Sequence, residues 1–210
     1  MFHDELKKVR RYSSSEIKKD GDAVVLKLKS TNWSFDVAPC FHTLPESNGR
    51  SYYLIPNKTG NWQMTDPIRD RDKVAACNKA NDGNVLELIR LIKKWGQTHL
   101  RNVPSYLLET IIVHSCEDPE SKIGENISQE FERALMSISS AIRGPISDLK
   151  RIQRDINTLP LSLRNNYWSI LNGARELSAK ALEAEKNGDI SLAFQRWQYV
   201  FGKEFPKYDG

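Results

Sequence analysis

The chain has 210 residues, of which 39% are apolar and 28% are charged, and its formal net charge is +4. This length suits one large domain or two small ones, and the weak positive charge allows an anionic ligand but does not indicate bulk nucleic-acid binding. No apolar run approaches the roughly 20 residues of a membrane span, and the charged N-terminus is unlike a secretory signal. Cys40, Cys77 and Cys116 are widely spaced, which indicates reduced thiols, so we expect a cytoplasmic protein.

The first third of the chain combines one helical pattern with several strand-like runs. Residues 2–12 predict a short helix, residues 19–22 a turn, and residues 23–29 a strand. The next strand lies within residues 31–41 and is expected to form an antiparallel hairpin with the one before it, and a third covers residues 52–56. Three strands are a poor core by themselves, so we expect an incomplete sheet that lacks its first strands.

The strand that contains Asp36 alternates between apolar and polar residues. Trp33, Phe35, Val37 and Phe41 are expected on one face, and Asp36 on the other. Aspartate is uncommon inside a strand because its side chain competes for backbone hydrogen bonds. Two interpretations stay open. Asp36 either makes a hydrogen bond at a sheet edge or binds a magnesium or manganese ion, since both ions prefer carboxylate oxygen.

The composition changes at about Asp66, after which every predicted element is a helix. Asp66 can cap the first helix, and Pro67 fits its first position. The expected helices cover residues 67–79, 85–99, 104–116 and 127–142, a short piece ending at 157, and residues 162–186 and 190–201. We therefore predict an α+β, mostly helical protein, with a partial sheet over residues 1–65, a helical domain over residues 66–206 and a polar tail over residues 207–210.

One lysine lies on the apolar side of the predicted second helix. On a helical wheel, Lys93 falls between Ile89 and Leu86, whereas Lys94 faces water. An ammonium group that is buried without a partner carries a large desolvation cost. Lys93 is therefore expected to reach out to solvent, to meet a glutamate, or to bind a phosphate group.

The predicted third helix begins with residues that suit an anion. Its first N–H groups are free, and its dipole favours negative charge. Ser105 adds a hydroxyl group in the first turn, and Tyr106 adds a ring that can stack on a base. The alternative is an ordinary capped helix whose tyrosine belongs to the core.

Other possible sites have weaker support. Asp20 with Asp22 and Asp70 with Asp72 resemble paired carboxylates, but the first pair lies in a turn and the second in the early turns of a helix, where acids are common. The histidines and cysteines do not have metal-ligand spacing, which argues against zinc. The sequence also contains no glycine-rich phosphate loop.

Taken together, these stretches resemble the CD-NTases, bacterial relatives of cyclic GMP-AMP synthase and oligoadenylate synthase that make cyclic nucleotide signals in anti-phage defence. The resemblance spans nearly the whole chain, and the order and spacing of its pieces make it specific. It includes residues 19–25, 35–39, 53–56 with Trp62, 65–67, 88–95, 104–109 and 197–206. It implies a nucleotidyltransferase-type sheet followed by a C-terminal helical bundle. It also implies metal-dependent joining of nucleoside triphosphates such as ATP or GTP.

The resemblance also implies roles for particular residues. Asp36 resembles the third catalytic carboxylate, which helps to bind Mg²⁺ (or Mn²⁺) and orients the attacking hydroxyl group. Lys93 and Ser105 resemble the contacts to the donor triphosphate, and Tyr106 resembles the residue that stacks on a nucleobase. In some systems of this family a ubiquitin-transfer-like enzyme conjugates the synthase through its C-terminus, here Gly210, for which the alternative is a frayed end.

The chain departs from the family's pattern in its first part. The family's core begins with a Gly-Ser motif on a helix and continues into a strand that carries Asp-x-Asp. This chain has no Gly-Ser dipeptide, and neither of its Asp-x-Asp pairs is predicted on a strand. Two-metal phosphoryl transfer needs several carboxylates, so Asp36 alone leaves most of the cationic charge uncompensated.

We therefore expect the C-terminal part of a nucleotidyltransferase, from a truncated or split gene, that is inactive as this chain alone. The first alternative is a non-catalytic nucleotide-binding or regulatory protein. The second is a helical interaction module that binds no ligand.

Overall fold

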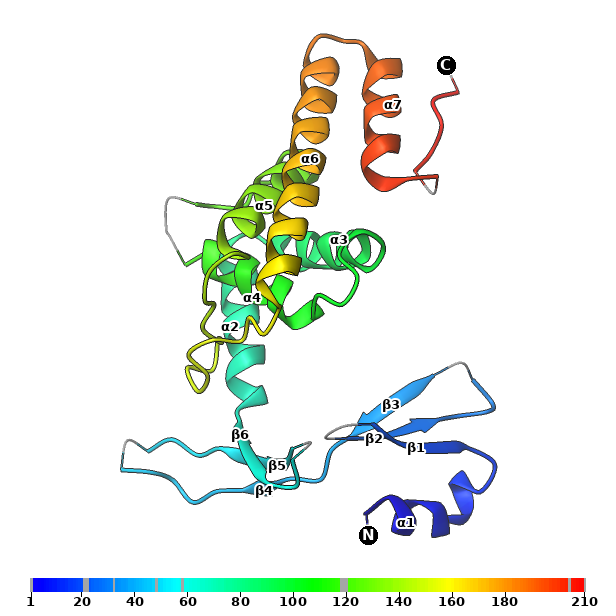
Figure 1. The fold of residues 1–210 in the computed structure, drawn as a ribbon, viewed down its shortest axis with the longest axis vertical. Helices are drawn as coiled ribbons and strands as arrows, with labels where there is room; N and C mark the ends of the chain where they lie inside the picture. The colour runs from blue at the N-terminus through cyan, green and yellow to red at the C-terminus, as the bar shows by residue number, and fades with distance from the viewer. Residues whose placement is uncertain are drawn as a thin grey trace. The chain divides into compact units, whose positions relative to one another are not determined.

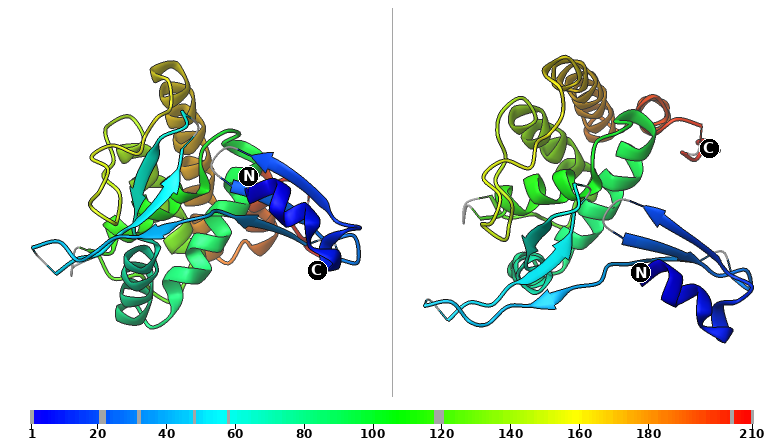
Figure 2. Two further views of the ribbon diagram at one scale, coloured as in Figure 1. Left: turned by 90° about the horizontal axis from the view of Figure 1, so that it is seen from below. Right: turned by 60° about the horizontal axis from the view of Figure 1, so that its bottom comes forward.

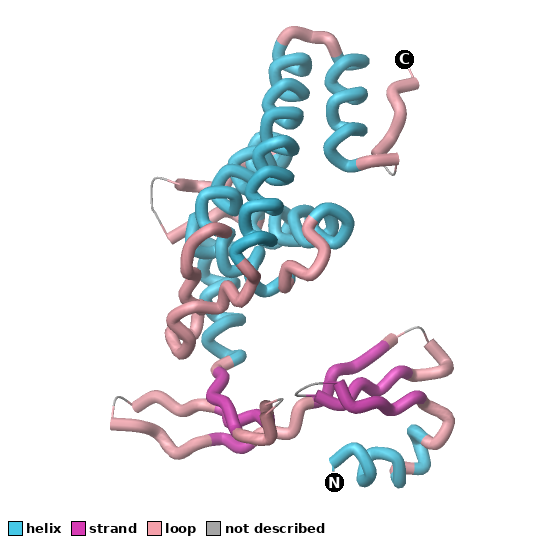
Figure 3. Tube along the Cα trace, in the orientation of Figure 1, coloured by secondary structure: helices cyan, strands magenta, loops and turns pink. Residues whose placement is uncertain are grey.

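The structure is a computed structural model that describes residues 2–20, 23–31, 33–47, 49–57, 59–117, 121–203 and 205–209. The chain divides into two compact units, Met1–Pro67 and Ile68–Gly210, and this division lies beside the boundary expected at residues 65 and 66. The first unit holds the strands, and the second is helical (Figures 1 and 3). The predicted α+β, mostly helical class is confirmed. In the described part of the chain, no helix is long and apolar enough to cross a membrane.

The first unit begins with a short helical segment and a three-stranded antiparallel sheet. Its elements are α1 (Phe2–Lys8), the 3-10 helix η1 (Arg10–Tyr12), β1 (Glu16–Asp20), β2 (Ala23–Lys27) and β3 (Ser34–Val37), with the strand order β1-β2-β3. The prediction of a turn at residues 19–22 was wrong for Lys19 and Asp20, which pair with Val24 and Ala23 as the end of β1. Strand pairing therefore outweighs the local preference of an aspartate for a turn.

The expected hairpin between the second strand and the strand of Asp36 is confirmed. β2 and β3 pair antiparallel, with Leu26 opposite Phe35 and Val25 opposite Asp36. Directly paired residues lie on the same face of a sheet. The face that carries Leu26 is packed against α1, and its buried residues are Ile17, Val24 and Leu26, with Phe2 and Leu6 beside them. Asp36 lies on the opposite face.

A second small sheet follows in the same unit. It is antiparallel and contains β4 (Phe41–His42), β5 (Tyr53–Pro56) and β6 (Trp62–Thr65), in that order. Phe41 was expected to continue the apolar face of the Asp36 strand, but it lies in this other sheet, where its ring contacts Trp62 at a centroid distance of 4.9 Å. The physical reason is Pro39, which has no N–H to donate to a continuing strand ladder.

The second unit consists of helices joined by short and irregular segments. They are α2 (Pro67–Ala80), α3 (Asn84–His99), α4 (Ser105–Ser115), α5 (Ile127–Ala141), α6 (Leu161–Lys186) and α7 (Ile190–Phe201). The short helix expected to end at residue 157 is absent from the described segment 143–160. There, Asp148 and Asp155 accept hydrogen bonds from the backbone N–H groups of Ile152 and Ile146, at 2.8 and 3.0 Å. Such bonds compete with helix formation.

The helices of the second unit enclose one large apolar core. Its centre is Phe131 on α5, which is fully buried and has ring contacts with Trp95 on α3 and with Trp197 and Phe201 on α7. α6 and α7 run side by side as an antiparallel pair, as the views in Figures 1 and 2 show. Gly188 lies between them at φ 77°, the left-handed conformation that glycine adopts easily after a helix. This core fixes the helices that carry the predicted nucleotide contacts.

Candidate functional site

The first turn of α4 carries two of the predicted site residues. Ser105 is the first residue of the helix and is exposed, and Tyr106 is half-buried. The N-cap residue is Pro104, which makes no side-chain hydrogen bond to the helix. Because the first N–H groups of a helix have no partner within the helix, this terminus can accept an anionic group beside the Ser105 hydroxyl.

Lys93 approaches the same helix from α3. Its ammonium group forms an ion pair and hydrogen bond with the carboxylate of Glu109 on α4, and the two side chains are 30% and 21% exposed. Lys93 was expected to reach solvent, to meet a glutamate or to bind a phosphate group. The structure shows the second of these, a contact with a glutamate. Glu109 lies four residues after Ser105, so the two share a helix face one turn apart. Lys93 is thus held near the N-terminus of α4, and its contact to a phosphate stays a prediction.

The hydroxyl group of Tyr106 belongs to a closed triangle of hydrogen bonds. It donates to Oδ1 of Asp70 at 2.8 Å. Nζ of Lys150 donates both to Oδ2 of Asp70 and to the hydroxyl oxygen of Tyr106, each at 2.9 Å, and it lies 4.4 Å from the centroid of the tyrosine ring. The triangle joins α2, α4 and the irregular segment 143–160. Tyr106 is therefore tied at its hydroxyl end as well as at its backbone.

Tyr106 and Lys150 keep their protons near neutral pH. Burial raises the pKa of Tyr106, so its hydroxyl group stays protonated and can donate. Burial by itself lowers the pKa of Lys150, but the hydrogen bonds to Tyr106 and Asp70 outweigh it, and the net effect is a raised pKa. Lys150 therefore remains an ammonium group even though the residue is only 9% exposed.

Asp36 lies in the first unit, in β3, where its side chain is exposed. The described residues contain no group of three or more His, Cys, Asp or Glu side chains that could hold a metal ion. Mg²⁺ takes its protein ligands mainly from carboxylates and keeps several waters, and a two-metal site needs several acids. Among the described residues, Asp36 therefore does not belong to such a group of acids, and its contact to Mg²⁺ or Mn²⁺ stays a prediction.

The weaker candidate pairs of acids do not act as pairs. Asp70 binds Tyr106 and Lys150, whereas Asp72 pairs with the exposed Arg71 at 2.8 Å. Asp20 ends β1, and its expected companion at position 22 lies outside the described residues, as does Gly210. Lys150 was not expected from the sequence, because it lies in an irregular segment and no local pattern marks it.

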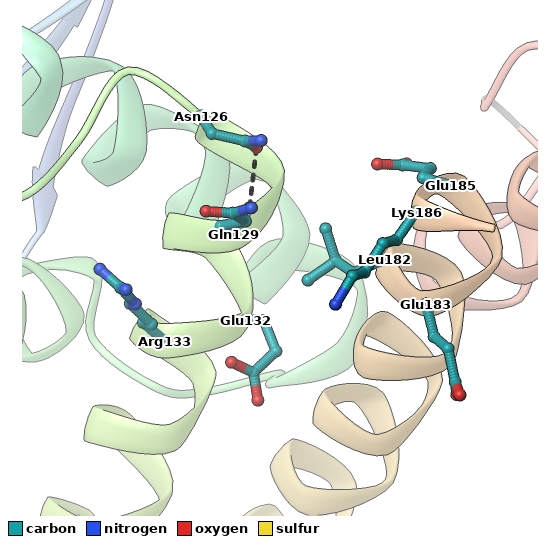
Figure 4. Close-up of a pocket in the computed structure, with 8 residues that line it drawn as sticks. All are labelled: Asn126, Gln129, Glu132, Arg133, Leu182, Glu183, Glu185 and Lys186. Carbon is teal, nitrogen blue, oxygen red and sulfur yellow. Dashed lines mark hydrogen bonds between the residues drawn. The ribbon is translucent and has the colours of Figure 1, made fainter. Parts of the chain in front are cut away.

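A groove of about 740 Å³ lies in another part of the helical unit, between the start of α5 and the end of α6 (Figure 4). It is lined by acidic, basic and amide side chains together with Leu182. The lining residues are Asn126, Gln129, Glu132, Arg133, Leu182, Glu183, Glu185 and Lys186. Asn126 caps α5 by accepting a hydrogen bond from the backbone N–H of Gln129 at 3.1 Å. The groove contains none of the predicted site residues and has no excess of positive charge that would favour a triphosphate.

Comparison with known proteins identifies relatives of one kind. The chain is 33% identical, over 201 residues, to a probable cyclic nucleotide synthase of Bacillus cereus (strain VD146), covering 96% of this chain and 60% of the relative. No family model matches the chain. The chain thus spans 60% of this relative's length, which is less than two thirds.

Solved structures share the fold. One is a complex of CdnC with HORMA from E. coli MS115-1, with a TM-score of 0.74 and 16% identity over 98% of this chain and 70% of that one. Another is the GTP-bound form of DncV from Vibrio cholerae, with a TM-score of 0.70 and 13% identity over 95% of this chain and 54% of that one. The chain thus has the arrangement of elements found in these two proteins.

Proposed function

We propose that the chain forms the C-terminal part of a CD-NTase, a nucleotidyltransferase that makes a cyclic nucleotide signal in anti-phage defence. In this proposal, Lys93 and Ser105 receive the triphosphate of an ATP or GTP molecule at the N-terminus of α4, and Tyr106 stacks on its base. The protein acts in the cytoplasm. The reaction joins a ribose hydroxyl group to an α-phosphate and releases pyrophosphate.

One observation carries the proposal. Lys93 on α3 is held by Glu109 one turn along α4 from Ser105, so an ammonium group and a hydroxyl group lie near the N-terminus of α4. A triphosphate is a stronger partner for an ammonium than a single carboxylate, because it offers more negative charge and several acceptor oxygens. A nucleotide can therefore compete with Glu109 for Lys93.

We propose that the missing acids come from polypeptide outside these residues. β3 is an edge strand in the order β1-β2-β3, and an open edge can pair with a further strand. Phe35 on β3 is 43% exposed and Trp33, two residues earlier, is 68% exposed, so the cover that α1 gives to this face leaves the edge strand partly open. In support, the chain spans 60% of its relative from Bacillus cereus. Asp36 on the same strand would join acids supplied by the added segment, and Mg²⁺ or Mn²⁺ belongs only to that assembled protein.

Calorimetric titration of the full 210-residue chain with ATP and GTP in magnesium buffer tests the triphosphate contacts. We expect Lys93→Ala to weaken binding by about tenfold or more, since it removes a charge-assisted contact, and Ser105→Ala by less. Lys94→Ala is the matched control, because this neighbouring lysine is exposed on another side of α3. Wild-type protein that melts cooperatively and binds neither nucleotide would contradict the proposal.

A complementation experiment tests the missing acids. The chain is expressed together with the segment of the Bacillus cereus relative that it does not cover, and cyclic nucleotide formation is measured with ATP and GTP. We expect product only from the combination, and none when Asp36→Asn is introduced. Product that depends on Asp36 from the purified chain alone would show that the chain needs no added acids.

A non-catalytic nucleotide-binding or regulatory protein is the second candidate function. In support, Lys93 is held on α4 by Glu109, near the predicted contact Ser105, whereas the described residues contain no group of three or more His, Cys, Asp or Glu side chains that could hold a metal ion. This function predicts nucleotide binding that depends on Lys93 together with no product in the complementation experiment. The HORMA protein found with E. coli CdnC suggests the kind of regulatory partner to test, alongside a ubiquitin-transfer-like enzyme.

A further inference from the structure

The triangle of Asp70, Tyr106 and Lys150 fixes the position of an aromatic ring. The hydroxyl group of Tyr106 both donates and accepts a hydrogen bond, and the three contacts measure 2.8, 2.9 and 2.9 Å. Two of the three groups are charged, and hydrogen bonds to charged groups are stronger than neutral ones. The three residues come from separate segments of the helical unit, so the ring cannot swing without breaking contacts to both α2 and the segment 143–160.

Burial shows that this contact is more than a surface ion pair. Lys150 is 9% exposed, and its side chain has a relative exposure of 11%, against 22% for Asp70. By comparison, the neighbouring pair of Arg71 and Asp72 on the same helix is 73% and 60% exposed. A long, flexible lysine is costly to order at a buried position, and its charge there needs partners. Lys150 meets the carboxylate and the tyrosine together, and these contacts help to offset both costs.

We propose that Asp70 and Lys150 are positioning residues that hold the Tyr106 ring ready to stack on the nucleobase of the bound nucleotide. This inference rests on the proposed function, in which Tyr106 is the base contact. A flexible aromatic side chain must be ordered when a ligand binds, and this ordering reduces affinity. The triangle orders the ring before the nucleotide arrives. Asp70 and Lys150 then favour base binding without touching the base or the phosphates.

Two probes separate the ring from the phosphate contacts. ATP needs both, whereas inorganic tripolyphosphate needs only Lys93, Ser105 and the helix terminus. Both are titrated by calorimetry into the full chain at one magnesium concentration. We expect Asp70→Asn and Lys150→Met to weaken ATP binding by about two- to tenfold, the factor that corresponds to ordering one side chain, and to change tripolyphosphate binding by less than about twofold. Asp72→Asn is the matched control and is expected to change neither.

A double-mutant cycle tests whether the two residues act through the tyrosine hydroxyl. Tyr106→Phe keeps the ring but removes the tether, so it is expected to lose as much ATP affinity as Lys150→Met. Combining the two substitutions should cause no further loss, because both remove the same constraint. If either single variant, Asp70→Asn or Lys150→Met, does not fold, the double variant that carries both substitutions is used in its place, because it removes both charges. Tyr106→Ala is expected to lose about tenfold, the usual effect of removing a base-stacking ring.

The outcomes distinguish the inference from the proposed function. Wild-type protein that binds neither probe overturns the proposed function and the inference with it. Wild-type protein that binds both, with ATP weakened by Tyr106→Ala but not by Lys150→Met or Tyr106→Phe, overturns the inference alone. An equal loss of ATP and tripolyphosphate in the triangle variants also overturns it, because that pattern indicates a general disturbance of α4.

Discussion

The two units of this protein differ in the size of the core that buries their apolar residues. In the helical unit, Phe131, Leu135 and Leu171 are completely buried within one core. In the sheet unit, Trp33 and Phe41 are 68% and 62% exposed. Both units contain aromatic residues. They differ in having a second layer to place them against, since a sheet or helix can bury its apolar face only when another element covers it.

The helical unit thus has a large core of its own, whereas the core of the sheet unit is small. The helical unit closes its core with helices from its own sequence. The sheet unit covers one face of the sheet from β1 to β3 with α1, but leaves β3 as an open edge. Substitutions in the two units should therefore have very different consequences for stability.

Removing a core ring from the helical unit is expected to have the largest effect. Phe131→Ala should lower the free energy of unfolding by about 3–5 kcal/mol, because it deletes a completely buried ring and leaves a cavity. The measurement is denaturant unfolding followed by circular dichroism. Trp33→Ala is the matched control from the sheet unit and should change stability by no more than about 0.5 kcal/mol. Similar losses in the two variants would break the comparison.

A smaller effect is expected in the irregular segment of the helical unit. Asn157 is 2% exposed and donates hydrogen bonds to the carbonyl oxygens of Ile142 and Gly144, at 2.7 and 2.8 Å. Asn157→Ala leaves those carbonyls without this donor and should cost about 1–3 kcal/mol. Asn172→Ala on α6 is the control and should cost less than about 0.5 kcal/mol. No loss from Asn157→Ala would mean that this segment is not integrated with the helices.

Acid should weaken the same segment through Asp155. Hydrogen bonds from the backbone N–H groups of Ile146 and Asn157 lower the pKa of Asp155 from its ordinary value of 3.8. A carboxylate with a lowered pKa stabilises the folded state above its unfolded-state pKa, and this contribution is lost as the pH falls through the lower folded-state value. Asp155→Asn keeps an acceptor oxygen that does not titrate. Its stability should therefore fall less steeply than that of wild type below about pH 4.

The acid experiment compares the free energy of unfolding of wild type with that of Asp155→Asn, measured by denaturant unfolding at several pH values. Parallel curves for wild type and Asp155→Asn in this range would contradict the prediction. Asp189→Asn provides a comparison, because Asp189 accepts a single backbone hydrogen bond, from Leu192 at 3.1 Å, as the N-cap of α7.

The smallest effect concerns chemical reactivity and leaves stability unchanged. Cys40 in the sheet unit is exposed, whereas Cys77 and Cys116 are half-buried against the helical core. We expect Cys40 to react first with a maleimide, because thiol modification requires access as well as a thiolate. Mass spectrometry of the partly labelled protein measures the order, and Cys40→Ser should remove the fast phase. A fast phase that persists in this variant would indicate that the helical unit opens readily.

Local signals in the sequence determined most of the elements. Asp82 and Gly83 adopt positive φ values of 55° and 92° between α2 and α3, in the gap between the helices predicted over residues 67–79 and 85–99. The hairpin of β2 and β3 and the change to an all-helical chain near Asp66 were also predicted correctly. These features depend on residues that are close together in the chain, so their composition and spacing carry the information.

The partners of the site residues were decided only by the tertiary structure. The sequence predicted that Lys93 needs a partner, but not that Glu109 on another helix provides it. It gave no sign that Tyr106 would meet Lys150, which is 44 residues away and lies in a segment expected to be helical. Period and propensity describe one segment at a time, whereas such contacts depend on how several helices pack around a common core. The sequence by itself therefore showed that a group such as Lys93 needs a partner. The packing of the helices decided which residue is that partner.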